Sequence, residues 1–158
     1  VVFTRAANVY GPGQQLYRII PRTLLSARTG KQMQLHGGGH SVRAFIHIQD
    51  VVRATLQLAN EGEPGSTWHL STQESCSIRG LVEQICTLTS ADFKALVQNS
   101  DERLGKDQSY LLDSTSMRQV HGWSDQITLD QGLQETLEWV DANLATLKTL
   151  PWNYQHKS

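Results

Sequence analysis

Several segments of the chain place apolar residues at the three- and four-residue spacing of a helix that buries one face. This spacing predicts helices over residues 17–30, 48–62, 77–89, 113–122 and 128–144. Glycine ends three of them, at Gly30, Gly62 and Gly122, and a glycine after the last periodic residue is typical of a helix C-terminus. Ser77 and Thr128 stand where N-caps are expected. We expect the 48–62 helix to be mostly buried.

Short runs rich in β-branched and aromatic residues separate these helices and predict strands over residues 1–8, 31–36, 43–48 and 66–71. Strands that alternate with helices favour an α/β fold with a mixed or parallel sheet covered by helices. Residues 90–110 do not distinguish loop from strand, and the tail at 151–158 has no regular pattern.

Composition narrows the class of protein. Apolar residues make up 39% of the 158 residues and charged residues 18%, as in a soluble globular protein of one domain. A net charge of −1 gives no overall field for nucleic acid or an anionic membrane. No run approaches a membrane span or a secretory signal. We interpret Cys76 and Cys86, placed on one helix, as buried thiols of a reducing compartment, which favours the cytoplasm.

The stretch LHGGGHSVRAF, residues 35–45, is the clearest candidate for chemistry. An oxyanion hole would require a G-x-S-x-G nucleophile elbow, and a P-loop would require G-K-[ST], and the chain has neither. Its histidines lack the spacing of a metal site, so no metal is expected. A tight turn is therefore the default interpretation. The G-x-G-x-x-G fingerprint of dinucleotide binding and a Tyr-x-x-x-Lys pair are also absent.

Six segments together carry a family resemblance: RAANVYGPGQ, IIPRTLL, LHGGGHSVRAFIHIQDVVRAT, GSTWHLS, ERLGKD and LLDSTSMRQVHGW with TLDQGLQETLEWV. Their order and spacing resemble the extended short-chain dehydrogenases that act on nucleotide-sugars, most closely the dTDP-glucose 4,6-dehydratases. The resemblance implies the C-terminal part of a doubly wound Rossmann-type fold. Residues 1–9, 48–60 and 66–70 would be late elements of the NAD-binding half, and 10–47 and 71–150 the smaller substrate-binding lobe.

The resemblance also implies functional residues. Asn8 and Arg43 match residues on the substrate diphosphate, and Val9 matches a position that lines the NAD site with its backbone. The remaining matches are to residues around the nucleotide and sugar: Arg18, Ile19, Gln34, Leu35, His36, Ser77, Glu102, Arg103 and Lys106. Catalytic residues would lie upstream of Val1. The glycine turn would then deliver Arg43 to the phosphates and His36 to the base.

This chain departs from the family pattern near the expected base and sugar. The dehydratases have proline at Gln34, tyrosine at His36, histidine at Lys106, a second asparagine at Val9 and Asp-Trp at Ala44–Phe45. Simpler roles also stay open. Asn8 could form a turn, Arg43 could pair with Asp50, His36 could be a surface residue, and Arg103 and Lys106 could be solvated loop charges.

The resulting hypothesis is the nucleotide-sugar binding part of an NAD-dependent nucleotide-sugar 4,6-dehydratase, a lyase, in cell-surface polysaccharide synthesis. Its partners would be NAD and a nucleoside-diphosphate sugar. The full-length protein is expected to form a homodimer, and this chain alone is expected to be inactive and not to form that dimer. The alternatives are a 4-epimerase or reductase of the same family, or a non-catalytic module with the same fold.

Overall fold

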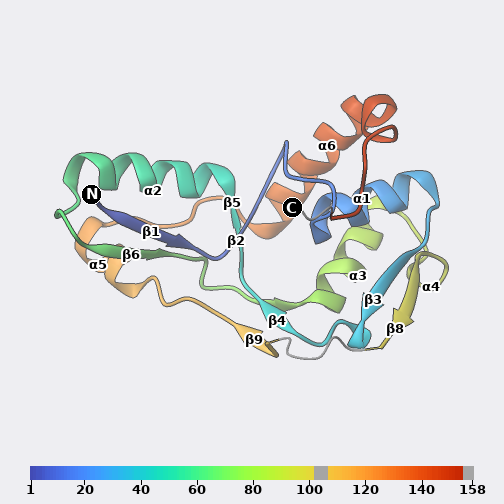
Figure 1. Cartoon of the computed structure of the whole chain (residues 1–158), viewed down its shortest axis with the longest axis horizontal. Coiled ribbons are helices and arrows are strands. Elements are labelled where there is room, and N and C mark those ends of the chain that lie inside the picture. The colour runs from blue at the N-terminus through green and yellow to red at the C-terminus, as the bar shows by residue number, and fades with distance from the viewer. Residues whose placement is uncertain (102–106, 155–158) are drawn as a thin grey trace. The chain divides into compact units, whose positions relative to one another are not determined.

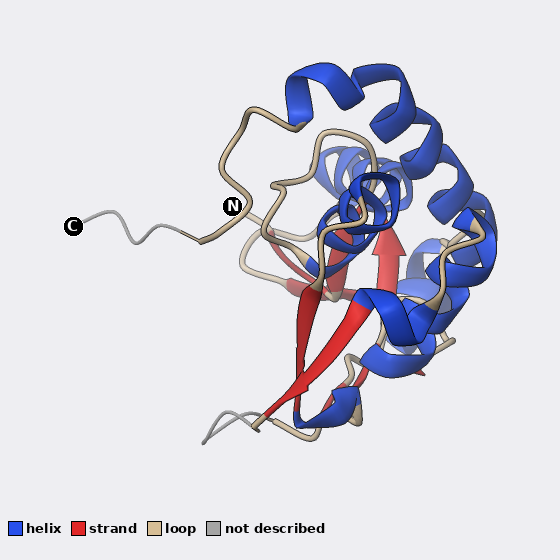
Figure 2. Ribbon diagram, turned by 90° about the vertical axis from the view of Figure 1, so that its right-hand side faces the viewer, coloured by secondary structure: helices blue, strands red, loops and turns tan. Residues whose placement is uncertain are grey.

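The computed structural model describes residues 1–101 and 107–154 and mixes helices with strands along the whole chain (Figures 1 and 2). Its contacts divide the chain into two units. Unit 1 comprises Val1–Tyr10, Ser41–Ser77 and Asp107–Gly132, and unit 2 comprises Gly11–His40, Ile78–Lys106 and Leu133–Ser158. The α/β class expected from the alternating pattern is confirmed.

Unit 1 is built on short, mostly parallel strand pairs. β1 (Phe3–Ala6) pairs with β6 (Thr67–Leu70), and β2 (Asn8–Tyr10) pairs with β5 (Phe45–His47), both in parallel. A three-stranded sheet has β4 (Val42–Arg43) at its centre, antiparallel to β7 (Cys76–Ser77) and parallel to β9 (Ser109–Tyr110). Parallel neighbours need crossover connections, which explains why the partners are far apart in sequence.

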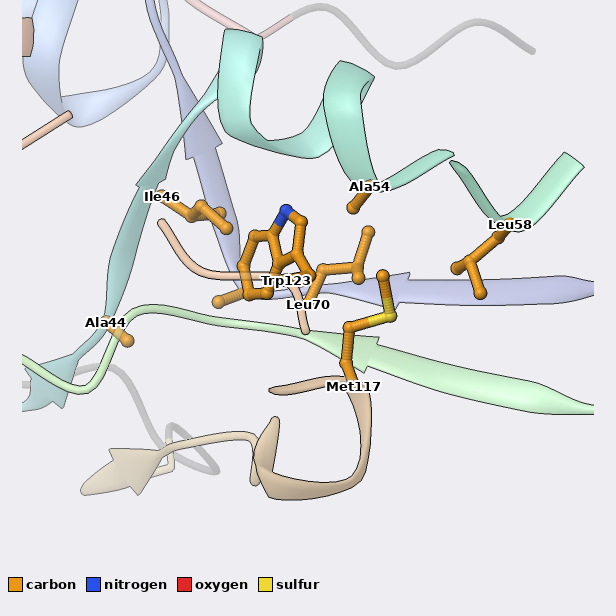
Figure 3. Packing of buried hydrophobic residues seen from close by; sticks show 8 residues of the cluster. Ala44, Ile46, Ala54, Leu58, Leu70, Met117 and Trp123 are labelled. Carbon is orange, nitrogen blue, oxygen red and sulfur yellow. The ribbon is translucent and has the colours of Figure 1, made fainter. Parts of the chain in front are cut away.

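Helices α2 (Ile48–Glu61) and α5 (Thr115–His121) complete unit 1 and supply its core. Figure 3 shows the cluster: Ala54 and Leu58 from α2, Leu70 from β6, Met117 from α5, and Ala44, Ile46 and Trp123. α5 ends at Gly122 with φ 61°, the left-handed conformation that the sequence predicts there.

The expectation that α2 is mostly buried is wrong for its outer face. Ala54 and Leu58 are buried, but Ile48, Val52 and Leu56 are exposed, with Leu56 at 61%. These three residues recur every four positions and therefore share one side of the helix. The apolar periodicity identified the helix correctly, but apolar residues on both sides cannot show which side the core covers.

The N-terminus of α2 is fixed by a buried carboxylate. Asp50 is fully buried and forms an ion pair with Arg53. Its Oδ1 accepts a hydrogen bond from the backbone N–H of Gln126 at 3.0 Å, and its Oδ2 from that of Ile127 at 3.2 Å. The indole N–H of Trp123 donates to the Asp50 carbonyl at 3.3 Å. This network binds the segment after α5 to the start of α2.

Unit 2 pairs β3 (Met33–His36) with β8 (Val97–Ser100) in parallel. Its helices are α1 (Ile19–Thr29), α3 (Ile78–Thr89), α4 (Phe93–Leu96) and α6 (Leu129–Leu147), of which α6 begins in unit 1. The core of unit 2 holds Met33, Leu35, Val82, Cys86 and Leu96. At the start of α6, the Thr128 hydroxyl accepts a hydrogen bond from the N–H of Gln131 at 3.3 Å, which confirms the predicted cap.

The two cysteines do not lie on one helix, contrary to the sequence-based prediction. Cys76 belongs to strand β7 and Cys86 to helix α3, and both are free thiols. Burial raises the pKa of each thiol, and nearby Asp92 and Glu83 raise that of Cys86 further. Within the described ranges, no helix is long and apolar enough to cross a membrane.

Substituting Asp50 should test the buried carboxylate. In Asp50→Asn, an amide nitrogen replaces one acceptor, so a backbone N–H is left unpaired and Arg53 loses its counter-ion. We expect a loss of about 3 kcal/mol in the free energy of unfolding, measured by urea denaturation. The control Glu138→Gln removes an exposed charge and should change stability by less than about 0.5 kcal/mol. Equal losses in both variants would contradict the role given to Asp50.

Candidate functional site

Arg43 occupies the central strand of the three-stranded sheet in unit 1. It lies opposite Cys76 of β7 on one side and Tyr110 of β9 on the other. Its guanidinium donates from Nη1 to the Val42 carbonyl and from Nη2 to the Asp107 carbonyl, each at 2.7 Å. Two carbonyl acceptors fix the plane of the guanidinium, and its other N–H groups remain available for an anion.

The structure assigns Asp50 to partners other than Arg43. The Asp50 carboxylate contacts Arg53 and two backbone N–H groups, while the contacts of the Arg43 guanidinium are with backbone carbonyls. The alternative in which Arg43 serves as the counter-ion of Asp50 is therefore wrong.

Asn8 lies next to Arg43 through the sheet. It begins β2, and both its backbone N–H and its side-chain Nδ2 donate to the carbonyl of Ala44, at 3.2 and 3.0 Å. Because the amide nitrogen is held by this carbonyl, the orientation of the Asn8 side chain is fixed. Residues 8 and 43, far apart in sequence, are thus joined through Ala44.

Ser77 is brought to the same sheet, where it pairs with Val42 across the β4–β7 ladder. It directly precedes α3, so the sequence located the strand-to-helix boundary correctly. Unit 1 therefore assembles Asn8, Arg43 and Ser77 around one short strand.

A polar pocket of about 340 Å³ opens in unit 1 and was not predicted from the sequence. Its lining residues are Ala44, the loop Ser71–Ser75, the segment Leu111–Thr115 and Arg118. Arg118 pairs with Asp125 at 2.5 Å and also donates to the Ser71 carbonyl at 2.9 Å. Partial burial would raise the pKa of Asp125, but hydrogen bonds from Arg118 and Thr72 lower it below its ordinary value. No local motif marks these residues.

Unit 2 contains the other described candidates. Arg18 is exposed at the N-cap of α1, and Ile19 is half-buried as the first residue of that helix. Gln34, Leu35 and His36 are on β3, where Gln34 is exposed and Leu35 is buried in the core. Leu35 can therefore offer a ligand only its backbone. The Nδ1 of His36 lies 2.7 Å from the hydroxyl of Ser100, so His36 is held in place by β8.

The triple glycine of unit 2 is a tight turn in the left-handed region. Gly37, Gly38 and Gly39 have φ of 56°, 64° and 74°, values that other residues adopt at a cost. A Cβ at Gly39 would lie 2.9 Å from the backbone nitrogen of Arg79 and 2.8 Å from Leu35. The default interpretation from the sequence, a tight turn, is confirmed, and close packing is a second reason for glycine.

Three candidates, Glu102, Arg103 and Lys106, lie outside the described residues. Among residues 1–101 and 107–154, no group of three His, Cys, Asp or Glu side chains could hold a metal ion. Val9, the candidate that contacts NAD, is the middle residue of β2 and pairs with Ile46. Because the sequence has neither a phosphate-binding glycine fingerprint nor a Tyr-x-x-x-Lys pair, the residues present do not fit the whole cofactor.

Comparison with known proteins supports this arrangement of residues. Residues 1–71 match the model of the NAD dependent epimerase/dehydratase family. A dTDP-glucose 4,6-dehydratase from Streptomyces niveus is 33% identical over 145 residues, covering 92% of this chain and 43% of the relative. The chain thus spans less than half the length of this relative.

Solved structures give the same answer. The dTDP-glucose 4,6-dehydratase of Bacillus anthracis, in complex with NAD, aligns with a TM-score of 0.86 at 30% identity, covering 92% of this chain and 46% of that one. A UDP-glucose 4-epimerase of Thermotoga maritima, with UDP-glucose, aligns with a TM-score of 0.84 at 27% identity, covering 90% and 46%. With the family model matching its first 71 residues and these similarities extending over about nine-tenths of its length, the chain belongs to the NAD-dependent epimerase/dehydratase family.

Proposed function

We propose that this chain is the nucleotide-sugar binding, C-terminal part of an NAD-dependent nucleotide-sugar 4,6-dehydratase. The observation that carries the proposal is the junction of Arg43 and Asn8 at Ala44, from segments 36 positions apart. An arginine fork and an amide, both held by backbone carbonyls, are suited to the two phosphates of a nucleoside-diphosphate sugar. The net charge of −1 gives no general attraction for such a ligand, so local cations must supply it.

The carbonyl contacts of Arg43 matter for affinity. A free arginine side chain loses rotamer freedom when it binds phosphate, and that loss weakens binding. Here Val42 and Asp107 already restrict the guanidinium. We therefore infer that Arg43 is preorganised for the diphosphate, while Asn8 and Ser77 provide neutral hydrogen-bonding groups beside it.

The nucleoside end is assigned to the remaining candidates. We propose that Arg18 and Ile19 cover the nucleotide and that Gln34, Leu35 and His36 lie along its base, with Leu35 acting through its backbone. Glu102, Arg103 and Lys106 would close over the ligand. A hydrogen bond to Ser100 orients the His36 ring, which supports a recognition role over that of a loose surface residue.

The catalytic residues and most of the NAD site are proposed to belong to the rest of the full-length protein. Residues 1–9, 48–60 and 66–70 would be late elements of its Rossmann half, as the parallel pairs β1–β6 and β2–β5 support. NAD would supply transient oxidation at C4 of the sugar. The role of this chain would be to bind and orient the sugar-nucleotide, with Val9 lining the cofactor. The homodimer of the full-length protein and its cytoplasmic location stay predictions.

A 4-epimerase or reductase would use the same clamp. The similarity to the Thermotoga maritima UDP-glucose 4-epimerase supports this alternative. Its chemistry would differ from that of a dehydratase in groups that this chain does not contain, so the binding predictions below apply to both. A non-catalytic module is the remaining alternative, and it would predict no turnover even when the rest of the protein is present.

Removing Arg43 should weaken nucleotide binding. A charge-assisted hydrogen bond contributes roughly 1.5–3 kcal/mol, so Arg43→Ala should bind UDP or dTDP about ten- to a hundredfold more weakly by calorimetric titration. Arg43→Lys should recover only part of this loss, because an ammonium group cannot form the bidentate contact. The exposed residue Arg5, on β1 of the same unit, provides a charge-matched control, since Arg5→Ala should keep wild-type affinity.

Stability must be measured beside affinity, because Arg43 also bonds the Asp107 carbonyl. Thermal melts of Arg43→Ala and Arg43→Lys show how much folded protein each titration contains. Unchanged affinity per folded molecule, together with a lowered melting temperature, would make Arg43 a structural residue and would remove the main support for the diphosphate clamp.

The 158-residue chain should not convert nucleotide-sugars by itself. It has neither the dinucleotide fingerprint nor the Tyr-x-x-x-Lys pair, so it has no tuned base and no complete cofactor site. Purified chain incubated with NAD and dTDP-glucose or UDP-glucose should leave the sugar unchanged by chromatography. Product formation above a no-protein blank would contradict the division of roles proposed here.

A further inference from the structure

A second pocket lies wholly within unit 2 and has a lining unlike that of the polar pocket in unit 1. It encloses about 610 Å³ and is lined by Tyr17, Arg18, Arg22, Asn153 and Tyr154. We call it the tyrosine–arginine pocket. Its volume lies within the roughly 300–1,000 Å³ range of small-molecule sites. Only Arg18 among these residues was a candidate from the sequence.

Aromatic contacts join the C-terminal segment to the start of α1. The rings of Tyr17 and Tyr154 pack edge to face with centroids 5.2 Å apart, and the Arg18 guanidinium lies 5.3 Å from the centre of the Tyr17 ring. These contacts place Tyr154, Tyr17 and Arg18 in one continuous group. Tyr154 remains 63% exposed, so much of its ring surface is available to a ligand.

The segment that carries Asn153 and Tyr154 is held in place by Trp152. The indole N–H of Trp152 donates to the Leu147 carbonyl at the end of α6, at 3.0 Å. The ammonium of Lys31 lies 4.9 Å from the centre of the Trp152 ring. Residues beyond the helix are therefore anchored on both sides of the pocket wall, although the sequence of the tail has no regular pattern.

The chemistry of the lining selects an aromatic anion. Arg18 and Arg22 contribute two positive charges, no carboxylate lines the pocket, and within the described ranges neither arginine is in an ion pair. Tyrosine rings stack on planar aromatic groups, and the Asn153 amide can both donate and accept hydrogen bonds. A planar base linked to phosphate satisfies all of these groups together.

We propose that the tyrosine–arginine pocket binds the nucleoside phosphate moiety of the ligand and that the C-terminal segment forms part of this site through Asn153 and Tyr154. The inference rests on the proposed function, which supplies a nucleoside-diphosphate sugar as the ligand. It extends that function by adding Tyr17, Arg22, Asn153 and Tyr154, which come from the loop before α1, from α1 itself and from the tail. Tyr154 stacks on the base, and Arg22 contacts phosphate.

Calorimetric titration of the 158-residue chain with UDP, dTDP and inorganic pyrophosphate separates the two roles. Base–aromatic stacking predicts that Tyr154→Ala weakens UDP and dTDP binding by about five- to a hundredfold and leaves pyrophosphate binding unchanged. Tyr154→Phe retains the ring and should bind like the wild type. Arg22→Ala should weaken binding of all three ligands, and Arg22→Lys should recover part of it. A thermal melt of each variant confirms that equal amounts of folded protein are compared.

Each other outcome overturns a defined part of the inference. If Tyr154→Ala and Arg22→Ala bind UDP and dTDP within twofold of wild type while Arg43→Ala binds weakly, the pocket is not part of the site and the proposed function stands. If Arg22→Ala weakens all three ligands but Tyr154→Ala has no effect, the pocket binds anions alone and the stacking role is wrong. If the wild-type chain binds neither UDP nor dTDP at millimolar concentration, the proposed function fails together with this inference.

Discussion

The buried carboxylate of Asp50 is the constraint on which unit 1 depends. A fully buried negative charge is tolerated only if it is paired and hydrogen-bonded, and here Arg53 and the N–H groups of Gln126 and Ile127 meet that need. The network fixes the first turn of α2, and β5 leads directly into that turn. The strand before it, β4, carries Arg43. The position of the proposed diphosphate clamp thus follows from satisfying one buried charge several residues later.

The candidate residues are positioned mainly by backbone groups. The Ala44 carbonyl accepts both N–H groups of Asn8, the Val42 and Asp107 carbonyls accept from Arg43, and His36 is oriented by Ser100 on the neighbouring strand. Backbone acceptors are the same whatever the side chains are. This arrangement allows the base-contacting positions to differ from the dehydratase pattern, as at Gln34 and His36, without disturbing the diphosphate clamp.

The two units carry different chemistry for one kind of ligand. Unit 1 presents an arginine fork with neutral hydrogen-bonding groups, which suits phosphate oxygens. Unit 2 presents aromatic rings with arginines in the tyrosine–arginine pocket, which suits a nucleoside attached to phosphate. In a family whose structural relatives include a dTDP-glucose 4,6-dehydratase and a UDP-glucose 4-epimerase, this division lets the base specificity change independently of phosphate binding.

The sequence by itself determined the local elements. The periodicity identified α1, α2, α3, α5 and α6, and the glycines marked the left-handed ends at Gly30 and Gly122, because helix periodicity and backbone sterics act over a few residues. It also indicated the tight turn at Gly37–Gly39 and the family, through motifs in a fixed order.

Only the tertiary structure decided which strands pair and which side chains meet. The ambiguous stretch at 90–110 supplies β8 and β9 because Val97–Ser100 pairs with β3 and Ser109–Tyr110 with β4. It also placed Cys76 in a strand, exposed one face of α2 and brought Tyr154 against Tyr17. A strand with a short, weak pattern gains its stability from a partner tens of residues away, and a pocket wall from contacts equally distant. Neither leaves a periodic signal in the local sequence.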